Sequence, residues 1–254
     1  MSGTREWDAG TYDRVSEPQL AWGRAVLDRL GPAGDELVLD AGCGTGRVTE
    51  LLIDALPDGS VIGVDGSREM IDAARGRLGP AVRLIHSDLL ELQLPDPVDA
   101  VFSSATFHWI RDHRRLFMNI ATWLRPGGRL EAQCGGEGNV AGFFAIVDRV
   151  AAREPYATSL ANMAPSRHFA GPGETAALLE GAGFVDVRCW LEPSQTRPPD
   201  PRAYIEGVCL GAHTTALPES ARESFVADVY EEWAADPVLD YVRLNISARR
   251  RSAD

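Results

Sequence analysis

Three glycines at alternate positions, Gly42, Gly44 and Gly46, follow a short apolar run and the carboxylate Asp40. Glycine adopts backbone angles that other residues avoid and lets a ligand approach the main chain closely. The stretch 38–46 is therefore predicted to be a strand that ends in a ligand-binding turn. A dinucleotide turn has the spacing G-x-G-x-x-G, whereas the third glycine here comes one residue early. In addition, Asp40 would repel a pyrophosphate but suit a cationic ligand.

Two further carboxylates follow later apolar runs. Asp65 ends the run 61–65, and Asp88 follows the run 82–85 after two residues. A carboxylate at the end of the second strand can accept two hydrogen bonds from vicinal ribose hydroxyls. The alternatives are structural: Asp65 can interact with the dipole of the following helix, and Asp88 can cap the short helix that follows it.

The elements that must position these residues alternate along the first half of the chain. Short apolar strands are expected at Leu37–Leu39, Val61–Val64, Val82–Ile85, Val98–Phe102 and Arg129–Gln133, and helices at Arg47–Ala55, Glu69–Leu78 and Arg115–Leu124. Ser67, followed by Glu69, is predicted to cap the second helix. Strands that alternate with helices predict an α/β fold with a parallel sheet.

The regular alternation ends after Gln133. Helices are expected near Phe143–Arg153 and at Thr175–Gly181, Arg202–Leu210 and Pro218–Ala235, strands at Phe184–Glu192 and Tyr241–Ala248, and a proline-rich connection between Pro193 and Pro201. We expect one domain over residues 1–254, in which 139–170 and 200–236 form a helical cap. In open α/β sheets ligands bind beyond the carboxyl ends of the strands, which is where such a cap is useful.

Composition narrows the function further. The chain has 254 residues, 44% hydrophobic and 24% charged, with a formal net charge of −12. This charge argues against a nucleic-acid partner, and the run Arg249–Arg251 is interpreted as a solvated tail. The apolar runs are too short to span a membrane, and the polar N-terminus is unlike a secretory signal. The four cysteines are scattered, so no metal site is predicted and a reducing cytoplasm is expected. The sequence leaves the oligomeric state open.

The acidic D-x-G-x-G-x-G turn, Asp65, Asp88 and the stretch from His108-Trp109 to Arg129 arrive in strand order. This arrangement resembles class I S-adenosylmethionine-dependent methyltransferases, and within them the branch that includes trans-aconitate and insect juvenile hormone acid methyltransferases. The resemblance covers roughly residues 7–135 and is weak between 140 and 235. It implies a Rossmann-like, mostly parallel seven-stranded sheet with helices on both faces and an antiparallel last strand.

The resemblance also implies roles for individual residues. S-adenosylmethionine would be the cofactor and S-adenosylhomocysteine the product, with N-terminal helices within residues 1–30 over the cofactor. The expected cofactor-binding residues are Tyr12, Asp40, Gly42, Gly44, Gly46, Asp65, Gly66, Met70, Asp88, Leu89 and Ser104. Met70 and Tyr12 have an equally good interpretation as packing residues.

The chemistry of methyl transfer to a small molecule indicates which residues would bind the methyl acceptor, at what we call the reacting end of the site. A carboxylate is ionised at neutral pH, so it needs hydrogen-bond donors and no base. Gln19, His108 and Trp109 supply an amide, an imidazole and an indole N–H, and they are the expected catalytic residues. The alternative acceptor is a hydroxyl or an amine, with His108 as general base. An NAD-dependent oxidoreductase and a non-catalytic binding protein stay open as other classes.

Overall fold

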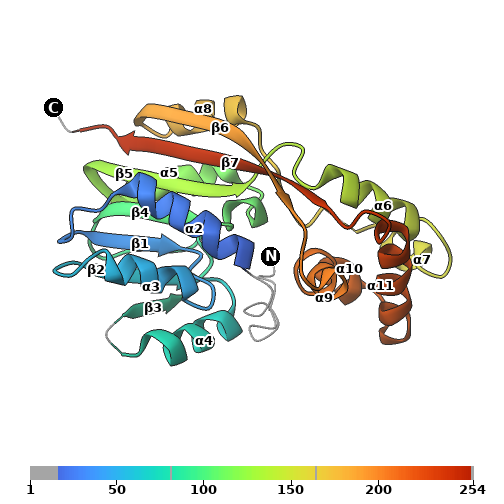
Figure 1. Ribbon diagram of the computed structural model, residues 1–254. Helices are drawn as coiled ribbons and strands as arrows, with labels where there is room; N and C mark the ends of the chain where they lie inside the picture. The colour runs from blue at the N-terminus through green and yellow to red at the C-terminus, as the bar shows by residue number, and fades with distance from the viewer. Residues whose placement is uncertain (1–16, 81, 164, 253–254) are drawn as a thin grey trace.

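A seven-stranded sheet forms the centre of the molecule, with the strand order β3-β2-β1-β4-β5-β7-β6 (Figure 1). The computed structural model describes residues 17–80, 82–163 and 165–252. The strands are β1 (Leu37–Ala41), β2 (Ser60–Asp65), β3 (Arg83–His86), β4 (Val98–Ser104), β5 (Leu124–Gly135), β6 (Phe184–Thr196) and β7 (Leu239–Arg250). Neighbouring strands from β3 to β5 pair in parallel, and β7 pairs antiparallel with both β5 and β6. This is the fold class that the sequence predicted.

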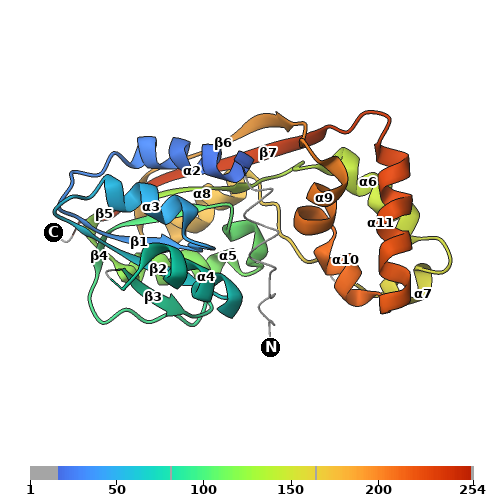
Figure 2. The same ribbon diagram turned by 60° about the horizontal axis from the view of Figure 1, so that its bottom comes forward.

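Helices cover both faces of the sheet (Figure 2). They are α2 (Glu17–Leu30), α3 (Arg47–Asp54), α4 (Arg68–Leu78), α5 (His113–Trp123) and α8 (Pro172–Gly181), with a 3₁₀ turn η1 (Phe107–Trp109) after β4. Side chains of α2 and α3 pack with alternate residues of β1, β2 and β4 in one hydrophobic cluster. Side chains of α5 and α8 belong to a larger cluster that contains the intervening strand residues. Consecutive strand residues point to opposite faces, so the sheet separates the two clusters.

Two helices begin at side-chain caps, Ser67 as predicted and Asp112, which the sequence analysis did not single out. The backbone N–H of Met70 donates to the Ser67 hydroxyl at 3.4 Å, and the N–H of Arg115 donates to the Asp112 carboxylate at 2.9 Å. Such caps satisfy N–H groups that have no partner inside the helix. Helix α4 thereby begins close to Asp65 at the end of β2, and α5 begins close to His108 in the turn η1.

A helical lobe lies beside the sheet, at the right of Figure 1. It contains α6 (Ala141–Ala151), α7 (Ala157–Leu160), α9 (Pro201–Tyr204), the π-helical turn η2 (Ile205–Cys209), α10 (Gly211–Ala216) and α11 (Glu219–Trp233). Apart from α10, these elements contribute to one hydrophobic cluster, with Phe143, Tyr156, Tyr204 and Phe225 among its buried members. We call this lobe the helical cap. Strands β6 and β7 run out of the sheet toward it (Figure 1).

Two sequence predictions in this region were wrong. The proline-rich connection begins later than expected, because β6 continues through Pro193 to Thr196. Since β6 is the last strand of the sheet, an edge position tolerates the missing N–H of Pro193. The single helix expected at 202–210 is divided between α9 and the π-helical turn, where the N–H of Leu210 donates to the carbonyl of Ile205 at 2.8 Å.

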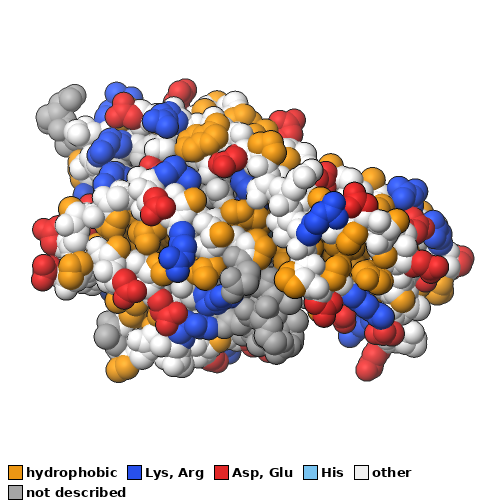
Figure 3. Space-filling view, viewed as in Figure 1, with side chains coloured by type: hydrophobic (Ala, Val, Ile, Leu, Met, Phe, Trp, Pro, Cys, Tyr) orange, Lys and Arg blue, Asp and Glu red, His pale blue; other side chains and the backbone are white. Residues whose placement is uncertain are grey.

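Acidic and basic side chains of the described residues are interspersed over the face in Figure 3. Among the helices of the described part of the chain, none is long and apolar enough to cross a membrane. The described His, Cys, Asp and Glu residues form no group of three or more that could hold a metal ion.

Candidate active site

The turn after β1 depends on its glycines for different reasons. Gly42, Gly44 and Gly46 have φ angles of 92°, 54° and 85°, in the left-handed region that favours glycine. A Cβ on Gly42 would lie 2.0 Å from the hydroxyl oxygen of Thr106, whereas a Cβ on Gly44 would meet nothing within 4 Å. Gly42 is therefore required by packing, and Gly44 borders open space in which a ligand fits.

Asp40 lies beneath this turn, 2% exposed. The Thr49 hydroxyl donates to its carboxylate at 2.7 Å. Burial, together with the negative charge of Asp65, raises the pKa of Asp40 from 3.8 to about 7, against the opposing effect of the Thr49 hydrogen bond. A bound cation would stabilise the ionised form.

Asp65 is the last residue of β2, and Asp88 comes two residues after the end of β3, so both lie at the same edge of the sheet. The Asp65 carboxylate accepts from the N–H of Gly44 at 3.0 Å and from that of Ser67 at 2.8 Å. Asp88 accepts from the N–H of Leu90 at 2.8 Å, so it caps the turn that follows, which was the structural alternative. Both carboxylates border the same cavity.

This cavity is large, about 980 Å³. At one end its lining includes the residues expected to hold a nucleoside: Asp65, Gly66, Met70, Asp88 and Leu89. Met70 is 3% exposed and Leu89 5%, so each both packs in the protein and presents an edge to the cavity. At the other end the lining includes Gln19, His108 and Trp109, the three residues expected at the reacting end.

A second, smaller cavity of about 60 Å³ lies between α2 and the glycine turn. Asp40, Gly42, Gly44 and Ser104 are part of its lining. The Ser104 hydroxyl oxygen and Oε1 of Gln19 are buried and have no hydrogen-bond partner among the described residues, and both residues border both cavities. Buried polar atoms normally have partners, so these two indicate where a polar ligand group binds.

His108 is held in one orientation. Its Nδ1 accepts a hydrogen bond from the N–H of Gly135 at 3.3 Å, and its carbonyl accepts from the N–H of His168 at 2.8 Å. Its ring stacks with Phe169 at a centroid distance of 5.9 Å. Burial, followed by the charges of Arg243 and Arg167, lowers the pKa of His108 well below 6.5. The ring is therefore neutral, with its proton on Nε2.

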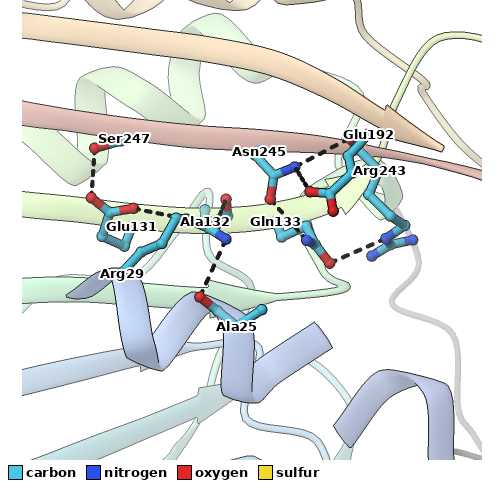
Figure 4. A network of polar contacts seen from close by, with 9 residues as sticks. All are labelled: Ala25, Arg29, Glu131, Ala132, Gln133, Glu192, Arg243, Asn245 and Ser247. Carbon is cyan, nitrogen blue, oxygen red and sulfur yellow. Dashed lines mark hydrogen bonds and ion pairs between the residues drawn. The ribbon is translucent and has the colours of Figure 1, made fainter. Parts of the chain in front are cut away.

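Two arginines lie at this end, Arg243 buried and Arg167 half-buried, and the sequence motifs did not single them out as site residues. Arg243 of β7 stacks on Trp22 at 4.0 Å and donates to Gln133 at 3.3 Å. Figure 4 shows that this contact continues a polar network beneath α2, in which Asn245 connects Gln133 with Glu192. Two residues, Gln133 and Asn245, thus separate Glu192 from the Arg243 guanidinium along the network.

The second arginine, Arg167, comes from the segment between α7 and α8. Its guanidinium lies 4.5 Å from the Trp109 ring centroid and 5.0 Å from that of Phe144. It lines the large cavity together with Arg243. No short motif marks either arginine, because they are brought together by the packing of the helical cap on the sheet.

Most of the expected site residues therefore meet at the carboxyl ends of the strands. Two of the expected residues, Gly46 and Tyr12, are not among those found there. Gly46 precedes α3 and lies outside the lining of both cavities, and Tyr12 lies outside the described residues. The open space beside Gly44, the three acidic residues and the unpaired Ser104 hydroxyl together fit a nucleoside with a cationic tail.

A sheet of this order, with a nucleoside-sized cavity over its strand ends, is that of a class I methyltransferase. Residues 38–128 match the family model described as a methyltransferase domain. A trans-aconitate 2-methyltransferase of Methylobacterium nodulans is 34% identical, over 96% of this chain and 98% of its own. Another, from an Azoarcus species, is 36% identical over 50% of each chain.

Solved structures agree on the fold. The chain superposes on a putative methyltransferase from Haloferax volcanii with a TM-score of 0.62 and 20% identity, over 98% of this chain and 97% of that one. For a phosphoethanolamine N-methyltransferase of Haemonchus contortus, solved with S-adenosylhomocysteine, the TM-score is 0.61 at 20% identity, over 96% of this chain and 57% of that one.

The chain belongs to the S-adenosylmethionine-dependent methyltransferases. It is an enzyme, and S-adenosylmethionine is its cofactor. The prediction of the family from the sequence is thereby confirmed, and the dinucleotide-dependent oxidoreductase is excluded.

Proposed function

We propose that this enzyme transfers the methyl group of S-adenosylmethionine to a carboxylate oxygen of a small organic acid. The observation that carries the proposal is the hydrogen bond from the N–H of Gly135 to Nδ1 of His108, 3.3 Å long. It leaves the ring proton on Nε2, so His108 presents a donor to the cavity. A general base would have to present a lone pair instead. A carboxylate is already ionised and needs a donor.

The distribution of charge along the cavity supports the same acceptor. Asp65 and Asp88 lie at the cofactor end, and Arg167 and Arg243 at the end that His108 shares. Because opposite charges attract strongly where water is excluded, the acidic end suits a cationic cofactor and the basic end an anionic acceptor. An uncharged alcohol or amine would leave this second end without a complement.

The residues at the reacting end have distinct tasks in this proposal. The bound cofactor supplies an electrophilic methyl group. Trp109 and His108 donate to one oxygen of the acceptor and thereby aim the other at the methyl carbon, and such orientation can lower a barrier by about 7–11 kcal/mol. The cavity walls exclude water.

Gln19 is proposed as the third donor. Its Nε2 lies 3.2 Å from the Tyr204 hydroxyl, and within the described part of the chain its buried Oε1 has no partner. Amide oxygen and nitrogen exchange places by rotation. With the Tyr204 hydroxyl donating to the oxygen, the amide N–H₂ occupies the unpaired position. It can then donate to an acceptor carboxylate.

We also propose that the chain is one functional domain, with 139–170 and 200–236 covering the acceptor. Residues from both stretches line the cavity, among them Phe144, Arg167 and Ala212. The full-length relative from Methylobacterium nodulans is a trans-aconitate 2-methyltransferase. Trans-aconitate is therefore the acceptor to test first.

The test measures S-adenosylhomocysteine formed from trans-aconitate as a function of pH. We expect turnover, with no limb of kcat/KM near pH 6–7 that depends on His108. His108→Ala is expected to lower kcat roughly 100-fold, the scale of losing one positioned donor, whereas His108→Gln keeps a donor and most of the activity. A limb near pH 6–7 that disappears in His108→Ala would instead support a hydroxyl or amine acceptor with His108 as base.

A further inference from the structure

Arg167 is half-buried and held by aromatic rings and backbone carbonyls. Trp109 and Phe144 flank its guanidinium at 4.5 and 5.0 Å. Its Nη2 donates to the carbonyls of Val208 at 3.2 Å and Cys209 at 3.0 Å. These carbonyls belong to the π-helical turn, and such turns interrupt the regular helical hydrogen bonds, often at functional sites. These contacts therefore fix the plane and direction of the guanidinium.

No carboxylate neutralises this cation within the described part of the chain. The ion pairs found there do not include Arg167, and its hydrogen bonds go to carbonyl oxygens. Arg167 is half-buried, and a charge with reduced access to water is costly unless an opposite charge compensates it. Arg243 has a different environment: it donates to Gln133, and Asn245 connects Gln133 with Glu192. The surroundings of Arg167 therefore favour an anionic ligand.

The position of Arg167 shows where such an anion binds. It lines the large cavity with His108 and Trp109, and its charge acts on the His108 ring. Both of its hydrogen bonds use Nη2, which leaves the N–H groups of Nε and Nη1 for another acceptor. An acid held by His108 and Trp109 would then have its far end close to Arg167.

We propose that Arg167 determines specificity by binding a second, non-reacting carboxylate of the acceptor. The site would thereby select acids with two or more carboxylates over those with one. This inference rests on the proposed function, because it presumes that another carboxylate of the same molecule receives the methyl group.

The experiment compares two acceptors that differ in one charge. Trans-aconitate is one, and the other is its analogue in which a carboxylate that is not methylated is replaced by a carboxamide of similar size. We expect Arg167→Gln to lower kcat/KM for trans-aconitate roughly 10–100-fold, mainly through KM, as for a lost hydrogen bond to a charged group. The carboxamide should change less than about threefold, so the preference between the two acids collapses.

Two further variants separate specificity from structure. Arg167→Lys keeps the charge and is expected to keep part of the preference. Arg202→Gln removes another cap arginine, which pairs with Glu223 and lies outside the cavity lining, and it should leave the preference unchanged. If Arg167→Gln does not fold, Arg167→Met is used instead, because its apolar side chain can fill the space beside the Trp109 and Phe144 rings. The ratio of kcat/KM for the two acids is then measured in that variant.

The outcomes distinguish the two proposals. Equal losses with both acids would make Arg167 a packing residue and overturn this inference, while carboxyl methylation would stand. Absence of turnover with carboxylic acids in the unmodified enzyme would overturn both. Collapse of the preference in Arg167→Gln, with the Arg202→Gln ratio unchanged, supports Arg167 as the specificity residue.

Discussion

Replacing Asp40 by asparagine should make the enzyme more stable above neutral pH and weaken its hold on the cofactor. The carboxylate is 2% exposed and accepts a hydrogen bond from Thr49 at 2.7 Å. Asparagine keeps an oxygen that can accept this hydrogen bond. It removes the negative charge, which is costly in the folded protein without a ligand but favourable to a cationic ligand.

The magnitude follows from the pKa of Asp40, which rises from 3.8 to about 7 on folding. Below pH 4 the group is protonated in both states and costs nothing. Between pH 4 and 7 the unfolded chain releases the proton that the folded protein keeps, so the stability contributed by this group falls as the pH rises. Above pH 7 the full cost is reached, about 4 kcal/mol for roughly three pH units.

The assay is urea unfolding of the ligand-free protein between pH 4 and 8. Because His108 and His113 also have lowered pKa values, the informative quantity is the difference between Asp40→Asn and the unmodified protein. This difference should shift in favour of the variant by about 4 kcal/mol from pH 4 to 8. If the amide N–H₂ of the new asparagine has no hydrogen-bond partner, it lowers the stability of the variant by about 1–3 kcal/mol at every pH.

Calorimetry with S-adenosylhomocysteine supplies the second half of the test. The ligand carries an ammonium group, so Asp40→Asn should bind it roughly 10–100-fold more weakly, the scale of losing a charge-assisted contact. Asp96→Asn, on an exposed loop residue, is the control and should change neither quantity. A stability difference that stays constant from pH 4 to 8 would refute the argument from burial, and unchanged affinity would remove Asp40 from the ligand site.

Further predictions concern the glycine turn and the ribose site. Asp65→Ala should weaken S-adenosylhomocysteine binding by about 1–3 kcal/mol in calorimetry; unchanged affinity would remove Asp65 from the site. Gly44→Ala should cost about 1 kcal/mol in urea unfolding because of its left-handed backbone, while calorimetry shows a larger loss of affinity, since the new methyl group projects into open space. Gly42→Ala should reverse this order, because its Cβ would meet the Thr106 side chain; equal effects of the two glycine variants would contradict the assignment.

The local sequence pattern was sufficient to predict the strands and helices of the first half of the fold. The strands before Asp65 and His108 are apolar runs, and the cap Ser67 marks the start of α4 chemically. The cap Asp112 was not recognised, and α5 begins two residues earlier than expected. The later elements depend on contacts between distant segments. Pro193 reads as a loop residue but extends β6 by pairing along β7.

The same division holds for the site. The cofactor end is built from residues next to strand ends, so order in the chain predicts their meeting. The acceptor end joins Gln19 of α2, Arg167 of the cap and Arg243 of β7, and these residues are far apart in sequence. The π-helical turn that presents two carbonyls to Arg167 is likewise fixed by packing, since its residues have no turn motif. Choice of acceptor is therefore the least predictable property of the chain.

The separate hydrophobic clusters of the sheet and the helical cap have a consequence for how this enzyme can change. Side chains in the cap cluster, such as Tyr156 and Phe225, can be exchanged without disturbing the cluster around β1 and β4. Mutations in the helical cap should therefore leave the sheet and its glycine turn folded, so that the part of the cavity lined by the cap can change while the rest is kept. Amide hydrogen exchange should accordingly reveal two cooperative units that open at different free energies.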